Sequence, residues 1–168
     1  KNAEVLVNAI SKYLQELDPD NKDTYAANSD AYVKKLAALD ADYQAAVDAA
    51  SNKTVLFGDR FPFRYLVDDY GLNYYAAFVG CSAETEASFE TISFLAKKVD
   101  ELKLPCVLTI EGAQHKIAET IVQNTAEKNQ KVLTMDSMQS TTSKDVKNGT
   151  TYLSVMEKNL SVLKEALG

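Results

Sequence analysis

Apolar residues in the first fifty positions recur at the spacing of helical faces. Residues 2–17 carry apolar side chains every three or four positions, the pattern of an amphipathic helix. The segment Asp18-Pro19-Asp20-Asn21 interrupts this pattern. A second helical pattern follows over residues 22–50, longer than the ~20 residues at which most globular helices end. Because it contains no sustained heptads, it does not predict a coiled coil.

After residue 52 the pattern changes to short apolar runs that alternate with helical segments. We expect strands at residues 53–57, 74–78, 105–110 and 131–135. We expect helices at residues 62–70, 87–102, 114–127 and 149–167. This alternation predicts an α/β fold with a four-stranded parallel sheet, flanked by helices on both faces and preceded by two helices. One structural domain would then comprise a helical segment, 1–52, and an α/β lobe, 53–168.

Composition and charge narrow the class of protein. A chain of 168 residues can bury a full core, and its 46% hydrophobic and 25% charged residues are ordinary for a globular protein. The net charge of −6 argues against binding to nucleic acid or to an anionic membrane surface. No segment is long and apolar enough to span a bilayer. The chain starts in a helical pattern without a methionine, so we expect it to be a piece of a longer protein.

The two cysteines and the single histidine do not form a recognisable metal-binding or redox motif in the sequence. Cys106 lies in an apolar strand pattern, where a buried free thiol is the usual state, although pairing with Cys81 stays open. Their spacing matches no zinc-finger or redox motif. His115 has polar neighbours at the start of a predicted helix, so we expect it to be exposed. One histidine also excludes a site built within this chain from several imidazoles.

Acidic residues cluster where the predicted strands end. The carboxyl ends of parallel strands share one edge of the sheet, and α/β folds bind ligands there. Five carboxylates would offer the oxygen ligands of a cation site at this edge: Asp59, Glu84, Glu86, Glu111 and Asp136. The alternative is that such acids cap the helices that follow the strands. Capping explains Asp136 least well, because a long loop follows it.

The segment from Gly58 to Leu66 surrounds one of these acids with two arginines. We expect Pro62 in the first turn of the next helix, which leaves Asp59 between strand and helix, as a cap or as a ligand. Arg60 and Arg64 would pair with nearby acids and fix their orientation, as the outer shell of a metal site requires.

Enzyme motifs are absent from the sequence. It has no nucleophile elbow, no phosphate-binding P-loop and no glycine-rich dinucleotide turn. An enzyme would have to use Asp59 and Asp136 as its acid and base.

Six segments together resemble the C-terminal half of the metal-binding solute-binding proteins of ABC transporters. This family comprises the zinc and manganese receptors of the ZnuA, AdcA and PsaA type, also called cluster A-I. The matching segments, in order, are Lys1-Asn2-Ala3, Leu17 to Lys22, Gly58 to Leu72, Gly80 to Ser88, Ile117 to Ile121, and Val132 to Asp136. The resemblance covers nearly the whole chain.

The resemblance implies a metal site in a cleft between two lobes joined by a long helix, a role that falls to residues 2–17. The N-terminal lobe of the family gives two ligands, usually His. The C-terminal lobe gives a His or Glu after its first strand and an Asp after its last, which carries over to Asp136. An ungapped alignment with the family places the first of these two ligand positions on Arg60, and a shift of one residue places it on Asp59. Because arginine cannot ligate, the resemblance implies Asp59, and an acid there moves the site toward harder cations such as manganese.

The resemblance therefore implies a binding protein rather than an enzyme. It would be an extracytoplasmic receptor lobe, periplasmic or on the cell surface, that captures zinc or manganese for an ABC permease. Its site would be incomplete without the N-terminal lobe, and an upstream lipid anchor would be its contact with the membrane. Two alternatives stay open, a cytoplasmic α/β enzyme that uses Asp59 and Asp136, and an adhesin-like module on the same fold.

Overall fold

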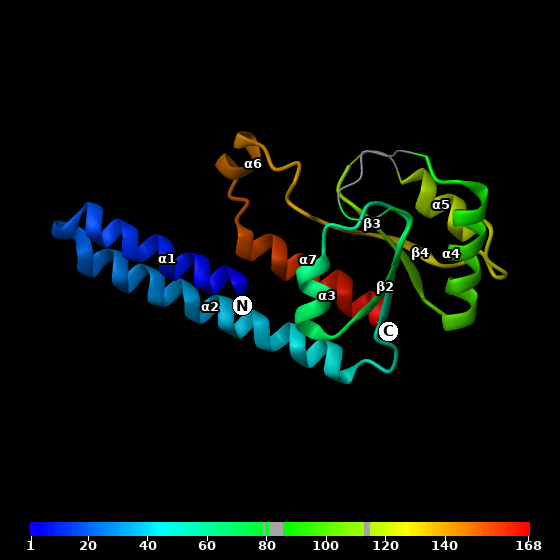
Figure 1. Ribbon diagram of the computed structural model, residues 1–168, viewed down its shortest axis with the longest axis horizontal. Coiled ribbons are helices and arrows are strands. Elements are labelled where there is room, and N and C mark those ends of the chain that lie inside the picture. Colours follow the sequence, from blue (N-terminus) through cyan, green and yellow to red (C-terminus); the bar gives the residue numbers. More distant parts are fainter. Residues whose placement is uncertain (79, 81–85, 113–114) are drawn as a thin grey trace. The chain divides into compact units, whose positions relative to one another are not determined.

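The computed structural model describes residues 1–78, 80, 86–112 and 115–168 (Figure 1). The chain divides into two compact units, residues 1–45 and residues 46–168. Glu84 and Cys81, which the sequence singles out, lie outside the described residues. No helix in the described ranges combines the length and apolarity needed to cross a membrane.

The first unit is helical. Helix α1 (Asn2–Leu17) is joined by a short 3-10 turn (Pro19–Asn21) to α2 (Lys22–Ala49), most of which belongs to this unit. Polar contacts connect α1 and α2, because the hydroxyl oxygens of Ser11 and Ser29 lie 2.8 Å apart and Ser11 is buried. The two predicted helices are confirmed. The apolar stripe of α1 is largely exposed, with large side chains at Val5, Leu6, Ile10, Tyr13, Leu14 and Leu17.

The second unit contains a parallel sheet of four strands. These are β1 (Thr54–Phe57), β2 (Asn73–Ala76), β3 (Cys106–Ile110) and β4 (Lys131–Met135). Their order in the sheet is β2-β1-β3-β4, and every neighbouring pair is parallel. The predicted α/β architecture is confirmed. The chain builds outward from β1 to β2 and then returns to the other side of β1, so the strand order reverses between β1 and β3.

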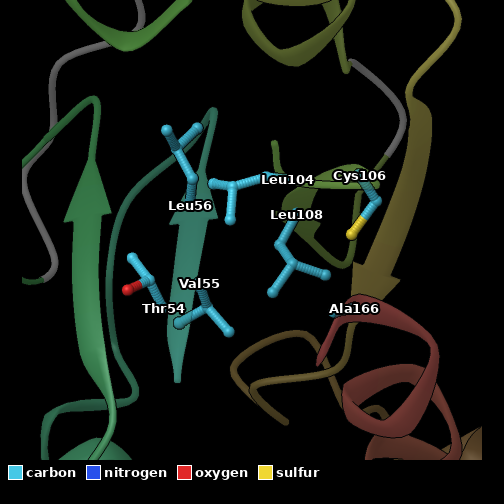
Figure 2. Close-up of a pocket in the computed structure, with 7 residues that line it drawn as sticks. All are labelled: Thr54, Val55, Leu56, Leu104, Cys106, Leu108 and Ala166. Carbon is cyan, nitrogen blue, oxygen red and sulfur yellow. The ribbon is translucent and has the colours of Figure 1, made fainter. Parts of the chain in front are cut away.

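Helices cover both faces of this sheet, as the alternating pattern predicts. Leu56 and Val107 point to the face covered by α4 (Phe89–Leu102) and α5 (Lys116–Gln123), where they join the main apolar core. Helix α7 (Tyr152–Leu167) packs against β1, β3 and β4. Figure 2 shows Cys106 and Leu108 on β3, which line a narrow gap together with Ala166 of α7. The gap leaves no space for a water molecule, so the side chains that line it pack without a cavity.

Cys106 is a buried free thiol, as its apolar strand predicts. Removal from water penalises the thiolate and raises the pKa of Cys106 to about 12. This cysteine is therefore a structural residue whose thiol has low reactivity.

Helix α3 (Arg64–Tyr70) begins later than the sequence predicts. Its N-cap is Phe63, so the placement of Pro62 in the first helical turn is wrong. The reason is aromatic packing, because the ring of Phe61 stacks on Tyr74 with centroids 3.8 Å apart. Phe61 and Phe63 are both buried, with ring centroids 5.3 and 5.4 Å from that of Phe57. Burying both rings keeps the segment out of the helix until Arg64.

The loop after β4 contains one short helix, α6 (Ser143–Lys147), and ends at α7. Thr142 and Thr151 each form a capping box at the start of the helix that follows. These two caps fix where the long polar loop becomes helical.

Candidate functional site

Three of the predicted acids follow neighbouring strands on one edge of the sheet. Asp59 comes two residues after β1, Glu111 directly after β3, and Asp136 directly after β4. Because all four strands are parallel, these positions lie at the same carboxyl edge. The strand order reverses between β1 and β3, and such a switch point is where open α/β sheets bind ligands. Asp59 and Glu111 flank that point.

Asp59 connects the end of β1 to the end of β3. Its Oδ2 accepts hydrogen bonds from the Thr109 hydroxyl at 2.7 Å and from the Ile110 N–H at 3.4 Å. Its Oδ1 accepts the N–H of Arg60 at 2.7 Å. The capping alternative for Asp59 is wrong, because α3 has Phe63 at its N-cap. The carboxylate is instead part of a network across the switch point.

Gly58 lets α5 approach this network closely. A Cβ atom at this position would lie 2.5 Å from the Cα of Ala118, which is too close for any side chain. The start of α5 therefore packs directly on the backbone that carries Asp59. Glycine is required here for close approach, not for an unusual backbone angle.

His115 belongs to the same network, which the sequence does not predict. Its Nδ1 lies 3.1 Å from the hydroxyl oxygen of Thr109, and Thr109 is fully buried. The expectation of an exposed histidine is wrong: His115 is half-buried at the N-cap of α5. One signal in the sequence points to this arrangement, since Thr109 is a polar residue in the otherwise apolar strand β3.

Glu111 holds the loop that follows β4. Its carboxylate accepts the N–H and the hydroxyl of Ser137, both at 2.7 Å, and the N–H of Gln139 at 3.0 Å. Partial burial opposes ionisation, but the donors from Ser137 and Gln139 outweigh it and hold the pKa of Glu111 below its usual value. Helix α5 has His115 at its N-cap, so Glu111 does not cap it. These donors, together with the Ser140 N–H at 3.3 Å, come from the loop after β4.

Asp136 is fixed from behind by α7. The side chain of Asn159, which is buried, accepts the N–H of Asp136 at 2.8 Å and donates to its carbonyl oxygen at 2.8 Å. The carboxylate Oδ1 accepts the N–H of Met138 at 2.7 Å, which closes a short turn. Met138 has a positive φ of 62°, uncommon outside glycine. Asn159 thus holds the backbone of Asp136 in place, a role that no pattern in the sequence predicts.

The two arginines differ in their partners. Arg60 Nε lies 3.8 Å from Asp59 Oδ1, a loose ion pair at the edge of the network. Arg64 Nε donates instead to Asp68 at 2.7 Å, one turn along α3, and this exposed carboxylate raises the pKa of Arg64. In the described ranges, Arg60 is therefore the arginine that accompanies the strand-end acids.

The remaining predicted acids precede α4. Glu86 is exposed, and the N-cap of α4 is Ser88, whose hydroxyl accepts the N–H of Thr91. Glu86 therefore does not cap this helix. Glu84 lies outside the described residues.

The described side chains do not complete a metal site by themselves. Among them, no three His, Cys, Asp or Glu residues come close enough together to hold an ion. A zinc site needs three or four such ligands. The described part of the chain can thus contribute only some of the ligands to any site at this edge.

Comparison with known proteins gives matches along almost the entire chain. A family model described as "ZnuA: Zinc-uptake complex component A periplasmic" matches residues 1–166. The zinc-binding lipoprotein AdcA of Streptococcus pneumoniae is 34% identical over 160 residues, which are 95% of this chain and 31% of that protein. The high-affinity zinc uptake system protein ZnuA of Bacillus subtilis is 28% identical over 161 residues, 96% of this chain and 49% of that protein. The chain thus spans 31–49% of the length of these curated relatives.

Solved structures share the fold. The Zn(II)-bound ZnuA-like domain of Streptococcus pneumoniae AdcA matches with a TM-score of 0.76 and 33% identity, covering 98% of this chain and 60% of that chain. The metal-dependent lipoprotein YcdH of Bacillus subtilis matches with a TM-score of 0.81 and 28% identity, covering 99% and 61%. The likeness therefore extends over both units of the chain.

Proposed function

This chain belongs to the family of ZnuA, the periplasmic component A of zinc-uptake complexes, and we propose that it is the C-terminal lobe of a zinc-binding receptor for ABC-transporter uptake. It acts outside the cytoplasm as a binding protein and catalyses no reaction. The observation that carries this proposal is the row of acids at the switch-point edge, held rigidly by neighbouring elements. Rigid oxygen donors at such an edge are suited to hold a cation.

Asp136 is the direct ligand that we propose with the strongest support. Its backbone is clamped by Asn159 and its Oδ1 is fixed by the Met138 N–H, so the carboxylate has one orientation. Asp59 contributes the second negative charge from the end of β1. Arg60 and Glu111 lie around these acids and help to orient the edge. We propose that Glu86 and Arg64 line the cleft further out, the role that the sequence also predicts for Glu84, which lies outside the described residues.

The remaining ligands come, in this proposal, from an N-terminal lobe. The exposed apolar stripe of α1 supports this, because such a stripe on a helix is normally covered by a partner. We propose that α1 is part of the helix joining the two lobes and that residues 53–168 form the C-terminal lobe. A lipid anchor upstream would hold the receptor at the membrane, where an ABC permease receives the zinc.

Zinc is the proposed cargo in preference to manganese. The curated relatives that match along the chain are named as zinc-binding or zinc-uptake proteins. A given set of nitrogen and oxygen ligands also binds zinc more tightly than manganese. Competition between the two ions in the full-length protein tests this choice, and manganese binding at least as tight as zinc binding would overturn it.

Calorimetry on the full-length protein tests the role of Asp136. The Asp136→Asn variant keeps an oxygen to accept the Met138 N–H but removes the charge. We expect it to weaken zinc binding by more than the roughly 10- to 100-fold typical of losing an outer-shell partner. The matched control is Glu127→Gln, an exposed acid in the loop that leads into β4 at the opposite edge. Equal affinities of Asp136→Asn and the control would rule out Asp136 as a ligand.

The incomplete site gives a second test. We expect the 168-residue chain alone to bind zinc weakly, since its own ligands cannot fill a tetrahedral shell. Tight, stoichiometric zinc binding by this chain would contradict the division of ligands between two lobes.

A further inference from the structure

We propose that His115 is a direct zinc ligand of this lobe through its Nε2 atom, and that Thr109 and Asp59 set the orientation of its ring. The inference rests on the proposed function and deepens it. It starts from a chain of two hydrogen bonds, from His115 Nδ1 to Thr109 Oγ1 and from Thr109 Oγ1 to Asp59 Oδ2.

The hydrogen-bond chain determines which ring nitrogen carries the proton. The Thr109 hydroxyl has one proton, and it is donated to the Asp59 carboxylate, which as an anion can only accept. At its 3.1 Å contact with His115, the Thr109 oxygen must therefore act as acceptor. The proton of the neutral imidazole accordingly lies on Nδ1, and the lone pair lies on Nε2. A lone pair on a ring nitrogen is what a zinc ion binds.

The hydrogen bonds of His115 match those of histidines that bind metal ions. Metal-ligating histidines usually donate their other ring N–H to an oxygen that fixes the tautomer and raises the basicity of the ligand. Here that oxygen belongs to Thr109, and the Asp59 carboxylate behind it supplies the negative charge. Thr109 is fully buried and cannot turn toward solvent, so the relay is held in place. Within the described residues, the ring of His115 makes its hydrogen bond through Nδ1, which leaves Nε2 for a ligand.

The position of His115 agrees with this role. It follows β3 and lies at the switch point between β1 and β3, on the edge that also carries Asp136. Asp59 already accepts hydrogen bonds from three donors: the Arg60 N–H, the Thr109 hydroxyl and the Ile110 N–H. Its contribution to the site is therefore made through His115, which adds an imidazole to the Asp136 carboxylate. A nitrogen ligand makes the edge better suited to zinc than carboxylates alone would.

Nuclear magnetic resonance of the ring nitrogens tests the proposal directly, because the chain contains a single histidine. In the 168-residue chain labelled with ¹⁵N histidine, we expect the neutral form of the ring to carry its proton on Nδ1. Added zinc should then shift the Nε2 signal. A ring protonated at Nε2, or an Nε2 signal that zinc leaves unchanged while the backbone signals of Asp136 move, would overturn the proposal and leave the proposed function intact. In the full-length protein, no response of either residue to zinc would overturn both.

Variants of the full-length protein test the relay by zinc affinity. We expect His115→Gln to weaken zinc binding more than Thr109→Val does, and Thr109→Val to weaken it about 10- to 100-fold. Thr109→Ser keeps the hydroxyl and should restore most of the affinity. The matched control is Thr134→Val, which changes an exposed threonine paired in register with Thr109 on β4. Thermal unfolding of each variant shows whether it is folded.

The ¹⁵N spectrum of Thr109→Val separates orientation from general damage to the fold. Without the Thr109 oxygen as acceptor, the ring proton is no longer held on Nδ1. The neutral ring should then be a mixture of the two tautomers in a chain that remains folded. A folded Thr109→Val variant with an unchanged tautomer and unchanged zinc affinity would overturn the relay. Full zinc affinity in His115→Gln would overturn the role of His115 as a ligand.

Discussion

Helices α1 and α4 carry similar amphipathic patterns, yet only one of them buries its apolar face. In α4, Leu95 and Val99 are 1% and 0% exposed and lie in the main core. In α1, Ile10 and Leu17 are 58% and 81% exposed. Both patterns correctly predict a helix with one apolar face. Periodicity shows which face of a helix needs a partner, but it does not show whether the same chain provides that partner.

The difference has a consequence for stability. Burying a large aliphatic side chain contributes about 1.5–3 kcal/mol, and α4 gains this against the sheet. The exposed side chains of α1 contribute little burial free energy. We therefore expect the second unit, residues 46–168, to account for most of the folding free energy of the chain.

Thiol reactivity should show the largest contrast between the two regions. Cys106 has a pKa raised to about 12 by burial, whereas an exposed thiol has a pKa near 8.5. A cysteine placed in α1 by Ile10→Cys should therefore react at pH 8 about a thousandfold faster than Cys106. A disulfide reagent, used on chains that also carry Cys81→Ser, measures both rates. Comparable rates would mean that the sheet opens readily or that α1 is covered.

Truncation of one apolar residue in each helix should give the next largest difference. Leu95→Ala removes a fully buried side chain and should lower the free energy of unfolding by about 2–5 kcal/mol. Ile10→Ala changes an exposed position and should change it by less than about 0.5 kcal/mol. Urea unfolding followed by circular dichroism measures both. If Ile10→Ala were as destabilising as Leu95→Ala, the α1 stripe would have to be buried in solution.

Loss of the N-cap residue should give a smaller difference in stability between the same two helices. The Ser88 hydroxyl accepts the Thr91 N–H at the start of α4, so Ser88→Ala should cost about 1 kcal/mol of stability. Lys1 makes no side-chain cap on α1, so Lys1→Ala loses no capping hydrogen bond and should lower the melting temperature less than Ser88→Ala. Thermal unfolding of both variants tests this, and equal shifts would contradict it.

Acid should destabilise the second unit through Glu111, the smallest effect expected. Its pKa is lower in the folded chain than in the unfolded chain, where it is near 4.3. The stabilisation is therefore complete above that unfolded value and is lost as the pH falls through the lower folded value. Glu111→Gln keeps a carbonyl acceptor and should cost less than about 1 kcal/mol at pH 7. Below about pH 4.5, the free energy of unfolding of Glu111→Gln should fall less steeply with pH than that of the wild type. Urea unfolding at a series of pH values measures both slopes.

Much of the fold follows from local patterns, but the start of α3 does not. The strand pattern predicts β4 with its observed bounds, Lys131–Met135, because a short apolar run that includes Val132 and Leu133 ends at Asp136. Pro62 and its neighbours satisfy the local preferences of a helix start. The stacking of Phe61 on Tyr74, which lies on another strand, overrides those preferences.

The candidate site divides in the same way. The positions of Asp59, Glu111 and Asp136 at strand ends can be predicted, because parallel strands share one carboxyl edge. Their partners cannot, because the Thr109 hydroxyl and the Asn159 amide reach them from other elements, and the His115 ring contacts Thr109 in turn. Local rules assign His115 to an exposed helix start, and only the packing of α5 against Gly58 brings it over β3.

The sequence by itself determined the helix and strand alternation, the parallel sheet, the row of acids at its edge and the resemblance to metal receptors. These properties depend on short-range periodicity and on residue types that can be seen one segment at a time. The tertiary structure decided which apolar faces are buried, which acids are held by which donors, and that one histidine joins them. Those outcomes depend on contacts between residues far apart in the sequence, as between Asp59 and Thr109, which are fifty positions apart.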